Sequence, residues 1–154
     1  MNLQRRQTGF TMVELVTSIV IIGILAAAIG PKFIGNQTFA ERGYTDEVAA
    51  ALRYAQAVAV ASGCGVRVTL TTTSYQAMQP TNAPPACSGS WTRVIARVDG
   101  GTLAGTTPNG VTLMPATQIV FDSQGRVVGG PPPALSTGGF TLSIDAVSGR
   151  VTVQ

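Results

Sequence analysis

The chain has 154 residues, a length that suits one compact domain with an appendage, and only 11% of its residues are charged. Its net charge of +3 falls to +1 (eight basic minus seven acidic residues) if the N-terminal segment with Arg5 and Arg6 is removed, so the remainder has no overall attraction for a polyanion. Histidine is absent, and we find no Ser/His or Cys/His arrangement, no phosphate-binding glycine loop and no close carboxylate pair, which argues against an enzyme, a cofactor and a metal site.

Residues 10–30 read FTMVELVTSIVIIGILAAAIG, an apolar run in which Glu14 is the sole charge. A helix needs about 20 apolar residues to cross a bilayer core, so this run predicts a transmembrane helix behind a short polar and basic segment, residues 1–9. A charge at the middle of such a helix costs about 2.5–3.5 kcal/mol, and charges retained there are usually functional. An accidental Glu near the end of a signal anchor is the alternative.

The helical pattern continues from this run to about residue 62, where Ser62-Gly63 predicts a stop. Pro31 inside the pattern predicts a kink or local unwinding. An ordinary secretory signal peptide cleaved near Ala26–Ala28 is less consistent with this continuation, and its apolar region would contain a carboxylate. Beyond the proline, apolar residues recur at a helical spacing and share one face: Tyr44, Val48, Leu52, Ala55 and Ala59.

Residues 63–154 are rich in Thr, Val, Gly and Pro, a composition typical of strands joined by turns. Alternating apolar residues over 66–70 predict a strand with one buried face, and Tyr75–Met78 is its expected hairpin partner. Two further hairpins are predicted, from Gln118–Phe121 to Val127-Val128 and from Phe140–Ile144 to Val151–Val153.

These elements predict an α+β fold, in which a long N-terminal helix over about residues 10–62 packs on a C-terminal antiparallel β-sheet head. This layering covers the apolar face of the helix and that of the sheet together. The expected organisation is a leader over 1–9, a membrane segment over 10–30, and the amphipathic helix with its globular head over 31–154.

Cys64 and Cys87 are the only cysteines, and they are too few and too far apart for a zinc site. In an exported domain two cysteines favour one disulfide, with two buried thiols as the alternative. Asp122 and Asp145 follow predicted strands, and we interpret them as turn-forming residues because a calcium site needs several acids close together. Tyr75 and Trp91 are expected to be core or edge residues of the head, with surface recognition as the alternative.

The leader that ends in Gly9, followed by Phe10-Thr11-Met12-Val13-Glu14-Leu15, resembles the prepilin signature of type IV pilins and type II secretion pseudopilins. The resemblance implies cleavage between Gly9 and Phe10 by prepilin peptidase and N-methylation of the new Phe10 amine. It also implies a long curved helix with a globular head, and attraction of the Glu14 carboxylate to the Phe10 amine of a neighbouring subunit as the filament grows.

Four segments of the remaining chain resemble the GspH/FimT group of minor pilins and pseudopilins: Arg53-Tyr54-Ala55-Gln56, Val60–Cys64, Phe121–Arg126 and Ser148–Val151. The cysteine pair and the Ala-rich helix before it are similar to a minor pilin of the mannose-sensitive haemagglutinin (MSHA) type. The implied function is a structural subunit that initiates, caps or decorates a type IV pilus or type II secretion pseudopilus. It would be held in the bacterial inner membrane with its head in the periplasm, and then join other subunits in the filament.

A second hypothesis makes the head a receptor for DNA or a host surface, displayed by the filament for natural transformation or adhesion. Some members of the FimT group bind DNA through exposed arginines near the C-terminus, and Arg126 and Arg150 each follow a turn glycine here. The C-terminal segment has no second arginine, which departs from that pattern. The positions of five arginines of the head would separate the two hypotheses: Arg67, Arg93, Arg97, Arg126 and Arg150. If they cluster on one face, they favour binding, and if they are scattered, they favour a structural role.

Overall fold

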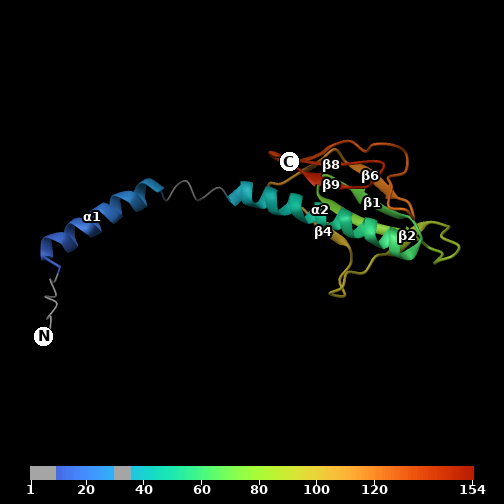
Figure 1. Cartoon of the computed structure of the whole chain (residues 1–154), viewed down its shortest axis with the longest axis horizontal. Helices are drawn as coiled ribbons and strands as arrows, with labels where there is room; N and C mark the ends of the chain where they lie inside the picture. Colours follow the sequence, from blue (N-terminus) through green and yellow to red (C-terminus); the bar gives the residue numbers. More distant parts are fainter. Residues whose placement is uncertain (1–9, 30–35) are drawn as a thin grey trace, which may run out of the picture. The chain divides into compact units, whose positions relative to one another are not determined.

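The structure, a computed structural model, describes residues 10–29 and 36–154. The chain divides into two compact units, Met1–Asn36 and Gln37–Gln154, and we consider each by itself. The described part of the first unit contains one helix, and the second unit combines a helix with antiparallel strands (Figure 1). The predicted α+β fold with an N-terminal helix before a β head is confirmed, and residues 30–35, at the middle of the helix predicted over about residues 10–62, lie outside the described residues.

Helix α1 covers Met12–Ile29 and begins with a side-chain cap. The Thr11 hydroxyl accepts a hydrogen bond from the Glu14 N–H at 3.2 Å, and the Thr11 carbonyl accepts one from the Leu15 N–H at 3.1 Å. Within the described residues, no helix combines the length and the hydropathy that a membrane crossing requires. Gly9, Gly30 and Pro31, where we predicted the cleavage site, the end of the span and the kink, lie outside the described residues.

Helix α2 covers Asn36–Ser62 and ends where the sequence predicted. Its predicted apolar face is confirmed, because Tyr44, Val48, Leu52, Ala55 and Ala59 are all buried. Figure 1 shows α2 lying along the strands of the head. Full burial of a Val or Leu side chain contributes about 1.5–3 kcal/mol, so this face supplies much of the attraction between helix and sheets.

The head contains two antiparallel sheets rather than the single sheet we expected. In the first, the strand order is β3-β2-β1-β6, and β4 also pairs with β2. In the second, the order is β5-β7-β8-β9. The strands are β1 (Val66–Leu70), β2 (Ser74–Pro80), β3 (Trp91–Val94), β4 (Ala104–Thr106), β5 (Leu113–Met114), β6 (Thr117–Phe121), β7 (Leu135–Thr137), β8 (Phe140–Ile144) and β9 (Val151–Val153).

Both sheets contribute side chains to one hydrophobic core with α2. Leu70 and Phe121 enter it from the first sheet, and Leu135 and Leu142 enter it from the second. The alternation of buried and less buried residues along β1 is the pattern expected of a strand with one face on the core. The core therefore holds α2 against the inner faces of both sheets.

Two predicted hairpins are confirmed, β1–β2 with Leu70 opposite Tyr75, and β8–β9 with Ile144 opposite Val151. The third predicted return is present in a short form, since Val127 forms an isolated antiparallel bridge with Phe121 and the Val128 N–H donates to the Val120 carbonyl at 2.8 Å. The pairing does not extend into a regular strand: the Val127 N–H donates to the Ala146 carbonyl at 2.9 Å, while β6 pairs along its length with β1.

Candidate functional site

The N-terminal candidate site is the start of α1. Phe10 is exposed, and Glu14 lies in the first helical turn, where a carboxylate interacts favourably with the helix dipole. The Glu14 carbonyl accepts hydrogen bonds from the Thr17 and Ser18 hydroxyls at 3.1 and 2.7 Å. Helix α1 contains no lysine or arginine, so a cationic partner for Glu14 must come from outside this helix.

The predicted disulfide is present in the head, where Cys64 and Cys87 are joined with their Cα atoms 5.2 Å apart. It links the segment that follows the end of α2 to the connection between β2 and β3. Beside it, the buried Gln79 side chain donates to the Ser62 hydroxyl at 2.7 Å and accepts from the Arg93 guanidinium at 2.8 Å. The bond and this polar cluster together fix the C-terminal end of α2 to the first sheet.

Gln56 of α2 joins two turns that are far apart in the sequence. Its side-chain amide donates to the carbonyl of Gly125 at 2.9 Å and to that of Ser148 at 2.7 Å. Gly125 and Gly149 both have positive φ, 79° and 66°, a conformation that glycine adopts without strain. Three of the four segments that resemble the GspH/FimT group therefore meet at this point, and sequence reasoning missed the role of Gln56.

The two aspartates form turns, as predicted. The backbone N–H of Arg126, donating to Asp122 at 2.9 Å, lowers the pKa of Asp122 below its ordinary value of 3.8, and the N–H of Gln124 adds to the effect. The hydroxyl and the backbone N–H of Ser148, each donating at 2.7 Å, lower the pKa of Asp145. Both carboxylates therefore stabilise their turns in the ionised form.

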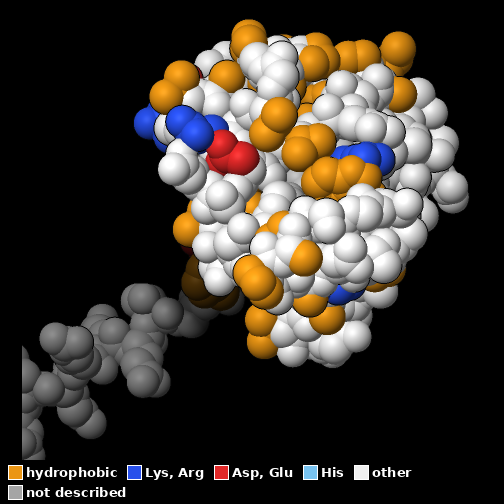
Figure 2. Space-filling model, turned by 90° about the vertical axis from the view of Figure 1, so that its right-hand side faces the viewer, with side chains coloured by type: hydrophobic (Ala, Val, Ile, Leu, Met, Phe, Trp, Pro, Cys, Tyr) orange, Lys and Arg blue, Asp and Glu red, His pale blue; other side chains and the backbone are white. Residues whose placement is uncertain are grey.

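The five arginines of the head lie on separate elements, and most contact other groups of the chain. The Arg67 guanidinium lies over the half-buried Trp91 ring, 4.5 Å from its centroid, and Arg126 pairs with Asp122 at 3.1 Å. Arg97 donates to two backbone carbonyls. Figure 2 shows the basic side chains of one face in separate places rather than in one patch. Arg126 and Arg150 alone lie on turns that meet, at Gln56. By the criterion stated above, the distribution of the five favours a structural role.

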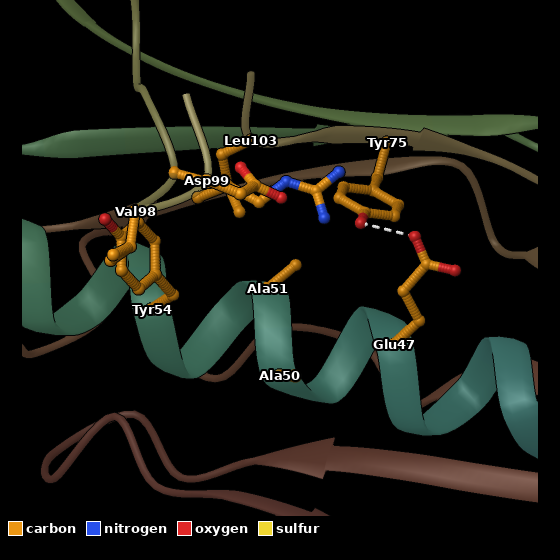
Figure 3. A pocket seen from close by; sticks show the side chains of 9 residues that line it. Glu47, Ala50, Ala51, Tyr54, Tyr75, Val98, Asp99 and Leu103 are labelled. Atoms are coloured by element: carbon orange, nitrogen blue, oxygen red, sulfur yellow. Dashed lines mark hydrogen bonds between the residues drawn. The ribbon is translucent and has the colours of Figure 1, made fainter. Parts of the chain in front are cut away.

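A groove on the head was not predicted from the sequence (Figure 3). It has a volume of about 400 Å³ and lies between α2 and the connection from β3 to β4. The Tyr75 hydroxyl donates to the Glu47 carboxylate at 2.7 Å. Burial raises the pKa of Tyr75, and this hydrogen bond adds to the effect. A Cβ at Gly105 would lie 2.5 Å from the Tyr75 ring and 2.6 Å from Glu47 Oε1, so only glycine fits beside this pair.

No local pattern could have revealed the groove, since Glu47 and Tyr75 are 28 residues apart and on different elements. Tyr75 itself is buried, as predicted for a core residue, and Trp91 lies on the edge strand β3. Of the predicted site residues, the structure brings together Cys64 with Cys87 and places Arg126 and Arg150 at the two turns that Gln56 joins. Glu14 lies in the other unit of the chain.

Comparisons with known proteins agree with this architecture. Residues 44–154 match the family described as "Type II transport protein GspH", and residues 4–30 match the "Prokaryotic N-terminal methylation motif". The type IV narrow pilus major component PilA5 of Thermus thermophilus is 33% identical over 102 residues, which are 66% of this chain and 69% of that protein. The type II secretion system core protein G of Vibrio cholerae is 43% identical over 51 residues, 32% of this chain and 35% of that protein.

The fold is also that of a solved structure. The crystal structure of the type IV minor pilin FimU of Pseudomonas aeruginosa aligns with a TM-score of 0.50 and 18% identity, over 73% of this chain and 91% of that chain. At this identity the likeness concerns the fold alone. Because the GspH match spans residues 44–154, most of the chain, and the methylation motif occupies its start, the chain belongs to the GspH family of type IV pilin-like proteins.

Proposed function

We propose that the chain is a minor subunit of a type IV pilus or type II secretion pseudopilus. It enters the inner membrane with its head in the periplasm, is cut after Gly9 by prepilin peptidase, is methylated on Phe10, and joins other pilin or pseudopilin subunits in a filament. The observation that carries this proposal is the combination of the N-terminal methylation motif over residues 4–30 with a GspH-type head over residues 44–154. The finer similarity to MSHA-type minor pilins stays a prediction.

The distribution of apolar side chains on α1 supports the proposed environments. Large apolar residues from Met12 to Leu25 point to all sides of the helix and are between 52% and 82% exposed. A helix that is apolar all round is stable only where lipid or other protein covers it. In the proposal, residues 10–30 are surrounded by lipid first and by neighbouring subunit helices afterwards.

Glu14 is the proposed assembly contact. Cleavage after Gly9 creates a positively charged amine at Phe10, four residues before Glu14. A close pair between this amine and the Glu14 carboxylate of a neighbour contributes up to roughly 4 kcal/mol at intermediate dielectric, before desolvation is subtracted. The lack of any basic residue in α1 is consistent with a partner from another subunit.

The processing step is tested by the intact mass of the protein purified from cells that contain the peptidase. We expect a mature chain that starts at N-methylated Phe10. A start after Ala28 would instead identify an ordinary signal peptide and contradict the proposal. The amount of mature chain in sheared filaments, compared with the membrane, then measures assembly.

The assembly contact is tested by Glu14→Ala, with Thr17→Ala as the matched control. The Thr17 hydroxyl donates to carbonyls of its own helix, so its loss changes α1 without removing a charge. We expect Glu14→Ala to insert into the membrane normally and to be depleted from filaments, whereas Thr17→Ala assembles like the wild type. Equal incorporation of both variants would show that Glu14 is not an assembly contact.

We rank the structural role above the receptor role for DNA or a host surface. Arg126, one of the two predicted contacts, is neutralised by Asp122 at 3.1 Å, and Arg150 lies at a turn that also carries Asp145. One or two phosphate contacts would in any case give weak binding that salt abolishes. Binding of the purified chain to double-stranded DNA at physiological salt would reverse this ranking.

A further inference from the structure

The groove between α2 and the β3–β4 connection combines an apolar lining with one well-positioned carboxylate. Ala50, Ala51 and Tyr54 line it from α2, and Leu103 and Val98 line it from the opposite side. Val98 is 96% exposed, the highest value among the large apolar residues of the described chain. The apolar lining and the exposed Val98 can take up the aliphatic part of a side chain that enters the groove.

Glu47 is held in place at one end of this groove. Tyr75, which is only 2% exposed, donates its hydroxyl to Glu47 Oε1, and Figure 3 shows the other carboxylate oxygen pointing away from Tyr75. The absence of a side chain at Gly105 leaves room for this pair, since a Cβ there would meet both Tyr75 and Glu47 Oε1. The site is therefore pre-organised for a donor that approaches from solvent.

Glu47 has no cationic partner within the described part of the chain, where the ion pairs are Arg42–Asp46 and Arg126–Asp122. Arg97 lines the same groove, but its guanidinium donates to the carbonyls of Thr102 and Ala104, at 3.0 and 3.2 Å. Asp99 accepts a hydrogen bond from the Gly101 N–H. With two carboxylates and one guanidinium, the groove carries a net negative charge.

We propose that this Glu47 groove binds a lysine or arginine side chain of a neighbouring pilin or pseudopilin subunit. The aliphatic stem of such a side chain would cover the apolar lining, and its charged head would reach the free oxygen of Glu47. The inference rests on the proposed function, because the neighbour is another subunit of the same filament. It adds a contact of the head to the proposed contact of α1.

A photo-crosslinking residue in the full-length chain tests the contact in cells that assemble the filament. We place p-benzoylphenylalanine at Ala50, in the groove, and at Ala61, an exposed position of α2 outside it. We expect Ala50 to crosslink to a peptide of another filament subunit that contains lysine or arginine. Glu47→Gln keeps an acceptor for Tyr75 but removes the charge, and should reduce the Ala50 crosslink roughly tenfold.

Asp46→Asn is the matched control, because it removes one exposed carboxylate from the adjacent position of the same helix. It should change the crosslink by less than about twofold, as expected for an exposed ion pair. Once the crosslinked basic residue is known, Glu47→Arg combined with a glutamate at that residue should restore the contact that Glu47→Arg alone abolishes.

The outcomes separate the two proposals. If the wild-type chain is in filaments but Glu47→Gln leaves the Ala50 crosslink unchanged, the groove contact is wrong and the subunit function stands. A crosslinked peptide without lysine or arginine has the same meaning. If the wild-type chain is absent from filaments, the subunit function is wrong and the groove contact falls with it. Thermal unfolding of each full-length variant in detergent is the control for folding. If Glu47→Gln acts through the contact and not through the fold, its melting temperature matches that of the wild type.

Discussion

Helices α1 and α2 belong to one chain but distribute their apolar side chains in opposite ways. On α1, large apolar residues such as Val20 (54% exposed) lie on every side, and no other element of the described first unit covers them. On α2, the apolar residues lie on one face, and Leu52 at the centre of that face is fully buried by the head. The stability of α2 therefore comes from its own unit, whereas in the proposed function α1 is covered by lipid or by other chains.

The acidic residues of the two helices extend this comparison. Glu14 of α1 and Glu47 of α2 are both exposed, and neither forms an ion pair within the described residues. Only Glu47 is oriented by another side chain, the hydroxyl of Tyr75. In the proposals above both carboxylates bind cations of neighbouring subunits, Glu14 in the filament core and Glu47 at the surface of the head.

The largest expected effect comes from truncating one apolar residue on each helix. Leu52→Ala should lower the free energy of unfolding of the head by about 2–5 kcal/mol, because it leaves a cavity between α2 and the sheets. Val20→Ala should leave head unfolding unchanged, since Val20 belongs to the other unit. Thermal unfolding of the full chain in detergent measures both. Equal losses would mean that α1 and the head unfold together.

A smaller effect is expected from the disulfide, which lies only in the head. Replacing Cys64 and Cys87 together with Ser should lower the stability of the head by about 3 kcal/mol, because the bond restricts the conformational freedom of the unfolded chain. Processing at Phe10 should not change, because the proposed cut lies in the other unit. Intact mass checks the processing and a melting curve checks the stability. A double variant that melts with the wild type would show that the helix–sheet packing alone fixes the end of α2.

Local patterns of the sequence predicted the helices and the two hairpins well. The buried face of α2 follows from helical spacing, and β8–β9 follows from alternation around Ser148-Gly149-Arg150. The expected return at Val127-Val128 is limited to one isolated bridge, whereas the long pairing of β6 is with β1, some fifty residues earlier in the chain. Alternation within a strand identifies its buried face but not its partner, and partner choice also decided that the head has two sheets.

Contacts between distant residues were the part of the candidate site that the sequence could not predict. The Glu47–Tyr75 hydrogen bond and the close approach of Gly105 depend on how β2 and β4 lie against α2. Gln56 is an intermediate case. Its segment resembles the GspH/FimT group, and so do the two turns that its side chain contacts. The co-occurrence of these segments was the available signal for their proximity.

The smallest expected effect concerns acid, and it should also be confined to the head. Asp122 and Asp145 have lowered pKa values in the folded protein, through hydrogen bonds from Arg126 and Ser148 in that order. A carboxylate whose pKa is lower in the folded than in the unfolded state stabilises the folded protein at any pH above its unfolded pKa. For the two aspartates the unfolded pKa is near 3.8, and the stabilisation is lost as the pH falls through the lower, folded value. Head stability should thus be constant near neutral pH and decrease below about pH 4.

Asp122→Asn with Asp145→Asn tests this dependence. The amide oxygens can still accept the turn hydrogen bonds, but without the charge that strengthens them, so the double variant should be slightly less stable than the wild type at neutral pH. Both carboxylates are near the surface, where solvent weakens such interactions, so we expect a change of only a few degrees in melting temperature. Between neutral pH and about pH 3 its melting temperature should change less than that of the wild type. Asp46→Asn, which removes an exposed carboxylate from α2 without affecting a turn, should keep the wild-type dependence. If the double variant keeps it as well, the acid sensitivity of the head arises elsewhere, and the two turns do not depend on the charge of their aspartates.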